Sequence, residues 1–377
     1  MTIKVAVLKE TRAGERRVAM VPDVVDRVSR LGTRVFVQSG AGDAIKLPDP
    51  AFKNATVVAD VTQLVADADI VLAVQPPSLE TVKAMKIGAI LVAFIYANKE
   101  PALVEALHEK NITCFAMERV PRITRAQAMD ALSTQAALSG YYGALLGATH
   151  LARIFPRMTT AVGSLRPATV LVMGLGVAGL QALATARRLG AVTEGYDVRS
   201  ETREEAASLG AKFVDTGIDA TGEGGYAREL SQEEKERVAK IVTAHVQQAD
   251  VVITTAAVPG RPSPKLISKA QVDGMKAGAV IVDLAADGGG NCECTEPGKT
   301  VQVGQVTIVA PLNVASLLGE HASELYAKNV LNLLELIIHD EKIAPDWNDD
   351  VLAKTALTRA DESSASATGL EAAEEPV

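Results

Sequence analysis

Residues 169–190 read TVLVMGLGVAGLQALATARRLG and combine a short apolar run, closely spaced glycines and a helix-length segment. Gly174, Gly176 and Gly179 form a G-x-G-x-x-G pattern that follows the run and opens the helical stretch. In a dinucleotide-binding βαβ unit the first glycine makes the turn, the second admits the pyrophosphate, and the third allows close helix–strand packing. The helix N-terminus then supplies N–H donors and a favourable dipole to the phosphates. The stretch therefore predicts a Rossmann-type domain that binds NAD(H).

An acidic residue ends the next apolar run, residues 193–198, which read TEGYDV. A carboxylate at the position of Asp197 hydrogen-bonds the adenosine ribose hydroxyls and repels a 2′-phosphate, which favours NAD over NADP. Arg199 follows two residues later and could accommodate that phosphate. The sequence alone leaves this preference open. The structural alternative, a glycine turn with a surface aspartate, explains less of the pattern.

Short apolar runs alternate with helix-length segments along both halves of the chain, which predicts an α/β fold. We expect two doubly wound Rossmann-like domains with a cleft between them, the second binding NAD(H). The expected boundaries are 1–130 plus about 315–350 for the first domain and 131–314 for the second. The predicted strands are residues 4–8, 34–38, 56–59, 69–75, 89–95 and 113–117, then 169–174, 193–198, 212–215, 250–257, 279–285 and 306–311.

Two long helices and a tail complete the expected organisation. Residues 125–153 contain no proline and predict one helix that joins the domains. Residues 324–340, ELYAKNVLNLLELIIHD, predict a helix that packs back on the first domain. The tail from about Thr358 is rich in Ala, Ser and Glu, and we expect it to be disordered.

Composition excludes several classes of protein. Apolar residues make up 48% of the 377 residues and aromatic residues 3%, so Ala, Val, Leu and Ile must build the core. The net charge of −8, without a basic stripe, argues against a nucleic-acid partner. The longest apolar run, residues 87–97, is too short to span a membrane, and the N-terminus resembles no signal peptide. Cys292 and Cys294 form a lone C-x-C, so we expect reduced thiols and no metal site.

Residues 121–135 read PRITRAQAMDALSTQ and concentrate polar groups without an obvious acid, base or nucleophile. Thr124 and Gln127 have the spacing of a capping box, which would make Gln127 a helix-start device. Asp130 and Ser133 continue the i, i+3 spacing along one helix face, which capping at Thr124 does not explain. Amide, carboxylate and hydroxyl groups on one face suit a carboxamide and a ribose, and Arg122 could reach the same end.

The sequence resembles the NAD(H)-binding component, domain I, of proton-translocating NAD(P) transhydrogenase. The similarity covers about nine-tenths of the chain and is most specific in the RAQ-x-MD-x-LS-x-Q block. It also includes KETRAGERRVAMVPDVV, GEGGYARE and DLAADGGGNCECTEPGK. The resemblance implies direct hydride transfer from NADH to NADP+ bound on a partner, a step that needs positioning and no proton abstraction.

The resemblance also implies roles for individual residues. Arg122, Gln127, Asp130 and Ser133 would surround the nicotinamide and its ribose and are the catalytic candidates. The remaining NAD(H) contacts implied are Ala128, Met129, Gly174, Gly176, Val177, Gly179, Asp197, Val198, Arg199, Gly225, Tyr226 and Ala257. Gly225 and Tyr226 would belong to a mobile loop that folds over the nucleotide, although a Gly-rich surface turn is the structural alternative.

Two other functions share part of these features. Alanine dehydrogenases share the two-domain plan but use a lysine and a histidine on the substrate, where this chain has the segment 73–75 and Tyr96. Arg17 and Asp287 resemble a substrate-carboxylate arginine and a catalytic aspartate of that group. A non-catalytic NAD(H)-sensing module would share the glycine pattern but would leave the 122–133 block unexplained.

The resemblance finally implies partners and a location. We expect a homodimer that works with an NADP(H)-binding β-subunit domain and membrane-spanning transhydrogenase subunits. These partners would hold the chain, as a cytoplasmic peripheral protein, at the inner face of the membrane. The end at residue 377 suits the form in which the α subunit is split into separate polypeptides, and a piece of a longer α subunit would look identical.

Overall fold

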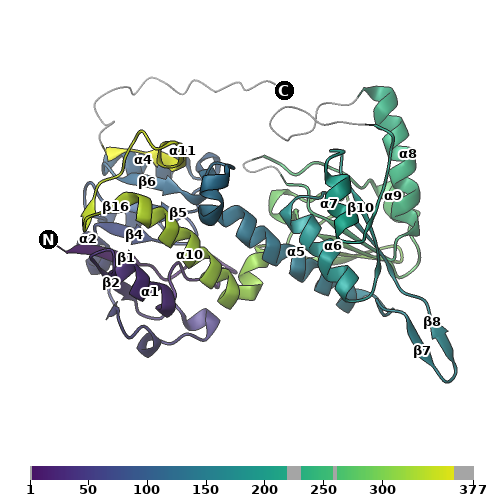
Figure 1. Ribbon diagram of the computed structural model, residues 1–377, viewed down its shortest axis with the longest axis horizontal. Helices are drawn as coiled ribbons and strands as arrows, with labels where there is room; N and C mark the ends of the chain where they lie inside the picture. The colour runs from purple at the N-terminus through teal and green to yellow at the C-terminus, as the bar shows by residue number, and fades with distance from the viewer. Residues whose placement is uncertain (1, 219–230, 258–260, 361–377) are drawn as a thin grey trace. The chain divides into compact units, whose positions relative to one another are not determined.

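The computed structural model describes residues 2–218, 231–257 and 261–360 and divides into two compact units. Unit 1 contains the described residues up to Gln135 and from Ala315 onward, and unit 2 contains Ala136–Val314. Each unit is built around its own seven-stranded sheet. Figure 1 shows these sheets with helices against them. The predicted fold class, two doubly wound Rossmann-like α/β domains, is confirmed.

The sheet of unit 1 has the order β18-β6-β5-β4-β1-β2-β3. Its first six strands in sequence pair in parallel, and the short edge strand β18 runs antiparallel to β6. The central strands are apolar and buried on both faces, as parallel strands between helix layers must be. The strands are β1 Ile3–Val7, β2 Thr33–Gln38, β3 Thr56–Val58, β4 Ile70–Leu72, β5 Ile90–Ala93, β6 Thr113–Ala116 and β18 Ala356–Thr358.

Helices of unit 1 cover both faces of this sheet and form two apolar clusters. One face packs against α1, α10 and α11, and the other against α2, α3 and α4. The predicted helix at residues 324–340 corresponds to α10, which packs within unit 1 as expected. The helices are α1 Pro22–Ser29, α2 Val61–Ala66, α3 Leu79–Ala84, α4 Pro101–Glu109, α10 Gly319–Ile337 and α11 Asp350–Thr355.

The sheet of unit 2 repeats this topology, with the order β11-β10-β9-β12-β13-β15-β14. All pairs are parallel except β14 with β15. Helices α6 and α7 pack on one face and α8 and α9 on the other. The elements are β9 Thr169–Met173, β10 Val192–Tyr196, β11 Lys212–Phe213, β12 Val251–Thr254, β13 Val280–Asp283, β14 Thr300–Val303, β15 Val306–Val309, α6 Val177–Arg188, α7 Thr202–Ser208, α8 Gln232–Gln248 and α9 Lys269–Asp273.

Within the described part of the chain, two small hairpins lie outside the main sheets. The hairpin of β7 (Met158–Thr160) and β8 (Gly163–Leu165) extends from unit 2, and β16 (Ile338–His339) pairs with β17 (Lys342–Ile343) after α10. Among the residues that the structure describes, no helix is both long and apolar enough to cross a bilayer.

The structure corrects the expected helix over residues 125–153. The α-helix, α5, spans Ala131–His150, and the preceding residues form a separate 3-10 segment, η5, at Thr124–Met129. The helical path breaks at Asp130, whose φ of −69° and ψ of 86° are not α-helical. Thr358, at the expected start of the tail, is buried in β18, and its hydroxyl donates to the carbonyl of Ile112. Residues 361–377 lie outside the described residues.

Candidate functional site

The turn from β9 to α6 has the features that a phosphate-binding turn requires. Gly174 has a φ of +92°, in the left-handed region that favours glycine. A Cβ on Gly179 would lie 1.8 Å from the carbonyl oxygen of Gly174, so only glycine permits this packing. A Cβ on Gly176, in contrast, would meet nothing within 4 Å. Gly176 offers no side-chain cap, so the first N–H groups of α6, including that of the exposed Val177, can be donated to an anion.

Asp197 follows β10, the second strand of unit 2, and its side chain is hydrogen-bonded to the turn after β9. Its carboxylate accepts from the main-chain N–H of Leu175 at 2.7 Å and from Arg199 at three nitrogens, at 2.9–3.1 Å. The hydrogen bonds to Asp197 raise the pKa of Arg199 above its ordinary value. The arginine that could have accommodated a 2′-phosphate is therefore engaged by the acid beside it. Val198, which lies between Asp197 and Arg199 in the sequence, is half-buried.

The other predicted nucleotide contacts of unit 2 are Ala257 and the loop residues Gly225 and Tyr226. Ala257 is exposed and follows the carboxyl end of β12, the strand next to β9. This end of β9 and β12 is the point at which strand order reverses, where open α/β sheets bind ligands. The predicted loop residues Gly225 and Tyr226 lie outside the described residues.

The polar block of residues 122–133 lies in unit 1, on and around η5. Arg122, Gln127 and Ala128 are exposed, whereas Met129 is buried with 5% of its surface accessible. Helix α10 holds η5, because Nδ2 of Asn329 donates to the carbonyl of Ala128 at 2.8 Å. The segment therefore presents polar side chains from a backbone that is fixed by a neighbouring helix.

Asp130 and Ser133 are brought together, but as a helix cap. The carboxylate of Asp130 accepts from the N–H of Ser133 at 2.9 Å and from its hydroxyl at 2.5 Å. Ser133 is the third residue of α5, so Asp130 is in the N-cap position. The structural alternative, a capping box formed by Thr124 and Gln127, is wrong, because η5 has no side-chain cap. The expected face from Gln127 to Ser133 does not continue through the break at Asp130.

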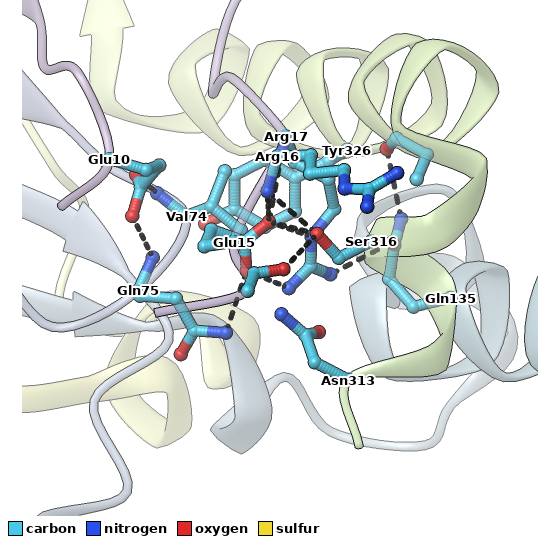
Figure 2. A network of polar contacts seen from close by, with 12 residues as sticks. Glu10, Glu15, Arg16, Arg17, Val74, Gln75, Gln135, Asn313, Ser316 and Tyr326 are labelled. Carbon is cyan, nitrogen blue, oxygen red and sulfur yellow. Dashed lines mark hydrogen bonds and ion pairs between the residues drawn. The ribbon is translucent and has the colours of Figure 1, made fainter. Parts of the chain in front are cut away.

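A buried ion pair lies in the loop between β1 and α1, residues 8–21 (Figure 2). The Arg17 guanidinium donates to both oxygens of the Glu15 carboxylate, at 2.8 and 2.6 Å, and to Gln135 Oε1 at 2.9 Å. The side chains of Glu15 and Arg17 are 0% and 4% exposed. Burial opposes ionisation of Glu15, but Arg17 outweighs it and lowers the pKa of this carboxyl to about 2.

Glu10 connects the same loop to the carboxyl end of β4. Its carboxylate accepts from the main-chain N–H groups of Val74 and Gln75 at 2.6 and 3.2 Å. Burial raises the pKa of Glu10 to about 7 despite these hydrogen bonds. Glu10 and Glu15 were not expected from sequence, and Arg17 only by resemblance. The available signal was a run of charged residues directly after a buried strand, at the edge of the sheet where ligands bind.

Comparison with known proteins identifies the family. Residues 6–139 match the alanine dehydrogenase/PNT N-terminal domain, and residues 143–365 match the C-terminal domain. The chain belongs to the alanine dehydrogenase/PNT family. Membership of this family implies an oxidoreductase that binds NAD(H).

Individual members of the family differ in their similarity to the chain. A polypeptide of NAD(P) transhydrogenase subunit alpha from Rhodospirillum rubrum is 43% identical over 95% of this chain and 96% of its own. Alanine dehydrogenase of Mycobacterium tuberculosis is 32% identical over 78% of this chain and 76% of its own. The predicted resemblance to transhydrogenase is confirmed.

Solved structures agree with the fold. The transhydrogenase from Sinorhizobium meliloti superposes with a TM-score of 0.83 at 39% identity, covering 95% of this chain and 97% of that one. An L-alanine dehydrogenase superposes with a TM-score of 0.78 at 23% identity, covering 95% of this chain and 96% of that one. The second likeness concerns the fold alone.

Alanine dehydrogenases are expected to carry a lysine within the segment that corresponds to residues 73–75 and a histidine at the place of Tyr96; in this segment Gln75 is the residue with a polar side chain. The side-chain amide of Gln75 donates to Glu15 Oε2 at 2.9 Å (Figure 2). Tyr96 has a φ of +52°, donates its main-chain N–H to Glu118 at 2.6 Å and stacks on Phe94. Neither an amide nor a phenol replaces the acid–base function of lysine and histidine near neutral pH.

Proposed function

We propose that the chain is the NAD(H)-binding component of proton-translocating NAD(P) transhydrogenase. The near full-length similarity to a transhydrogenase alpha-subunit polypeptide, at 43% identity, carries this proposal. The chain would support direct hydride transfer from NADH to NADP+ bound on a partner subunit. Membrane-spanning partner subunits would couple this transfer to proton translocation.

The geometry of unit 2 supports NAD(H) as the bound nucleotide. The open face of Gly176 and the uncapped start of α6 fit a diphosphate. Asp197 stands where a carboxylate would bind the adenosine ribose. When bound, the dihydronicotinamide supplies the hydride, and the task of the protein is to bind, orient and exclude water.

The polar block supports hydride transfer without proton transfer. Arg122 and Gln127 are exposed donors on a fixed backbone, and Asp130 and Ser133 start α5 beside them. We propose that Arg122, Gln127, Asp130 and Ser133 orient the nicotinamide and its ribose, with Ala128 and Met129 contributing main chain. None of these residue types is a general base near neutral pH except Asp130, which is already engaged as a helix cap.

The proposed assembly is a homodimer that docks on an NADP(H)-binding β-subunit domain at the inner face of the membrane. The β7–β8 hairpin supports self-association, because it exposes Met158, Val162 and Leu165 at 45%, 99% and 53%. Exposed apolar side chains gathered on one projecting element are typical of an association surface. The membrane subunits would place this otherwise cytoplasmic chain as a peripheral protein.

Absorbance-monitored hydride transfer from NADH to a spectrally distinct NADP+ analogue tests the function. The chain is measured alone and together with a purified NADP-binding partner component. Rapid transfer in the mixture alone is the expected result. Intact NADH binding without transfer would favour the NAD(H)-sensing module, and turnover of alanine or another amino acid would favour the dehydrogenase.

Substitutions in the polar block test the site. Arg122→Ala, Gln127→Asn and Asp130→Asn are expected to slow hydride transfer about tenfold to a hundredfold, since misplacement of reacting groups is costly. Asn is itself a good N-cap, so Asp130→Asn should keep α5 intact, which circular dichroism checks. Unchanged rates in all three variants would contradict the assignment.

A further inference from the structure

A buried carboxylate organises the loop that follows β13. Asp283 is fully buried, and its oxygens accept from five donors between 2.5 and 3.1 Å. These donors are the hydroxyls of Thr254 and Thr295 and the main-chain N–H groups of Ala285, Asn291 and Cys292. Hydrogen bonds to an ionised acceptor are among the stronger ones, so this loop has one defined path.

The ammonium of Lys265 also binds the main chain of this loop. Its Nζ donates to the carbonyls of Gly289, Gly290 and Cys292, at 2.7, 2.8 and 3.3 Å. The carboxylate of Asp283 thus accepts from main-chain N–H groups of the loop, and the ammonium of Lys265 donates to its main-chain carbonyls. The loop can act as a rigid support for whatever its side chains contact.

Asn291 extends from this loop to the end of β12. It is fully buried, and its amide both accepts from the N–H of Ala256 at 3.0 Å and donates to the carbonyl of Ala256 at 2.7 Å. It also donates to the carbonyl of Pro264 at 2.8 Å. The side chain thus pairs with both main-chain groups of Ala256, as a neighbouring strand would.

The segment that Asn291 fixes lies directly behind the phosphate turn. The hydroxyl of Thr255 donates to the carbonyl of Gly174 at 2.7 Å. A Cβ built on Gly174 would lie 3.1 Å from the main-chain nitrogen of Ala256. The segment after β12 therefore lies against the turn, and a shift of Ala256 would reach the turn through Thr255.

We propose that Asn291 is a positioning residue for the dinucleotide site, acting through Ala256 and Thr255 on the turn at Gly174. This inference rests on the proposed binding of NAD(H) and adds a determinant of its affinity. Asn291 sets the distance between the turn after β9 and the segment after β12. These are the two main-chain segments that border the proposed nucleotide site at this end of the sheet. Its effect falls on the diphosphate portion of the ligand, because Gly174 belongs to the phosphate turn.

The test uses Asn291→Ser in the full chain, which removes the amide and leaves the main-chain bonds to Asp283. Affinities for NADH and ADP-ribose are measured by calorimetric titration, and both are expected to weaken about tenfold. Thr255→Val removes only the hydrogen bond to Gly174 and is expected to act in the same direction. Amide hydrogen exchange should rise at Ala256 and Ala257 but not within β12 in the Asn291→Ser variant.

Val280→Ala is the matched control, because it removes packing from fully buried β13 without touching the turn. It should lower the melting temperature and leave NADH affinity unchanged. Unchanged affinity in both Asn291→Ser and Thr255→Val, or an equal loss in Val280→Ala, would overturn the positioning role. If Asn291→Ser does not fold, Thr255→Val decides alone. Absence of NADH binding by the unaltered chain would instead overturn the proposed function.

Discussion

The two sheets share a strand order but finish their central strands in opposite ways. In unit 2, β9 passes into α6 through residues 174–176, of which Gly176 is exposed and has open space around it. In unit 1, β1 reaches α1 through residues 8–21, which place Glu10, Glu15 and Arg17 at the corresponding end of the sheet. After the short turn, the first N–H groups of α6 are available to an anion. In the long loop, the carboxylates of Glu15 and Glu10 instead pair with Arg17 and with the main-chain N–H groups after β4. Loop chemistry, and not strand order, therefore decides what each unit can bind.

A substitution of Gly179, which packs closely against Gly174 in unit 2, should have the largest effect on NADH affinity. Gly179→Ala would place a Cβ 1.8 Å from the carbonyl oxygen of Gly174, so the turn must move. NADH affinity, measured by titration, is expected to fall by more than about a hundredfold, which corresponds to roughly 3 kcal/mol.

Gly176→Ala is the companion variant of that experiment. Its Cβ has open space, so the melting temperature should not change. Its NADH affinity should still fall, since the added methyl group occupies the face that the phosphates approach. Equal binding by Gly176→Ala and the unaltered chain would contradict the position assigned to the diphosphate.

Breaking the charge cluster of unit 1 should affect stability alone. Arg17→Met leaves the buried carboxylate of Glu15 without its cation, and the free energy of unfolding is expected to fall by about 3–5 kcal/mol. Denaturant unfolding measures this loss, and the folded fraction should bind NADH with unchanged affinity.

Two further variants calibrate the loss at Arg17. The double variant Glu15→Gln with Arg17→Met should recover part of the stability, because neither charge is then buried alone. Arg125→Ala breaks ion pairs of an exposed arginine with Asp349 and Asp350 and should have a much smaller effect. A loss at Arg125 equal to that at Arg17 would remove the distinction between them.

The free energy of unfolding should depend on pH through Glu10 in the unit 1 loop. Its pKa is raised from 4.5 to about 7 in the folded chain. Between these values the unfolded chain is ionised while the folded chain keeps its proton, so this contribution to stability is lost as pH rises through about 7. Glu10→Gln should therefore flatten the fall in unfolding free energy between pH 5 and 8. At pH 8 it should be more stable by about 2 kcal/mol, allowing for one weaker hydrogen bond.

Central parallel strands such as β4 and β5 could be predicted because each is a short, fully apolar run. The edge strands β14 and β18 were not predicted, since TVQV and ALT are short and each pairs with a single neighbouring strand. The start of α5 was misplaced because Thr124 and Gln127 match a capping pattern more closely than Asp130 and Ser133 do. In the structure the backbone leaves helical geometry at Asp130, and α5 begins at the next residue.

The buried charges of unit 1 show a different limit of prediction. A charged residue in a sequence indicates exposure unless its partners are known. Glu15 is buried because Gln75, Ser316 and Arg17 surround it, and two of these lie 60 and 301 residues away. The glycine pattern of unit 2, by contrast, was predictable because its contacts are local or between adjacent strands.

The smallest expected effect concerns nucleotide choice at Asp197. Asp197→Asn keeps an oxygen for the N–H of Leu175 but removes the charge that engages Arg199. NADH affinity should fall about tenfold, since an ionised acceptor for the ribose hydroxyls is lost. NADPH affinity should rise, because the guanidinium becomes available to a 2′-phosphate. Adding Arg199→Ala should abolish that gain, and calorimetric titration of all variants with both nucleotides measures it. A gain that persists without Arg199 would mean that repulsion by Asp197, and not capture of the arginine, excludes NADPH.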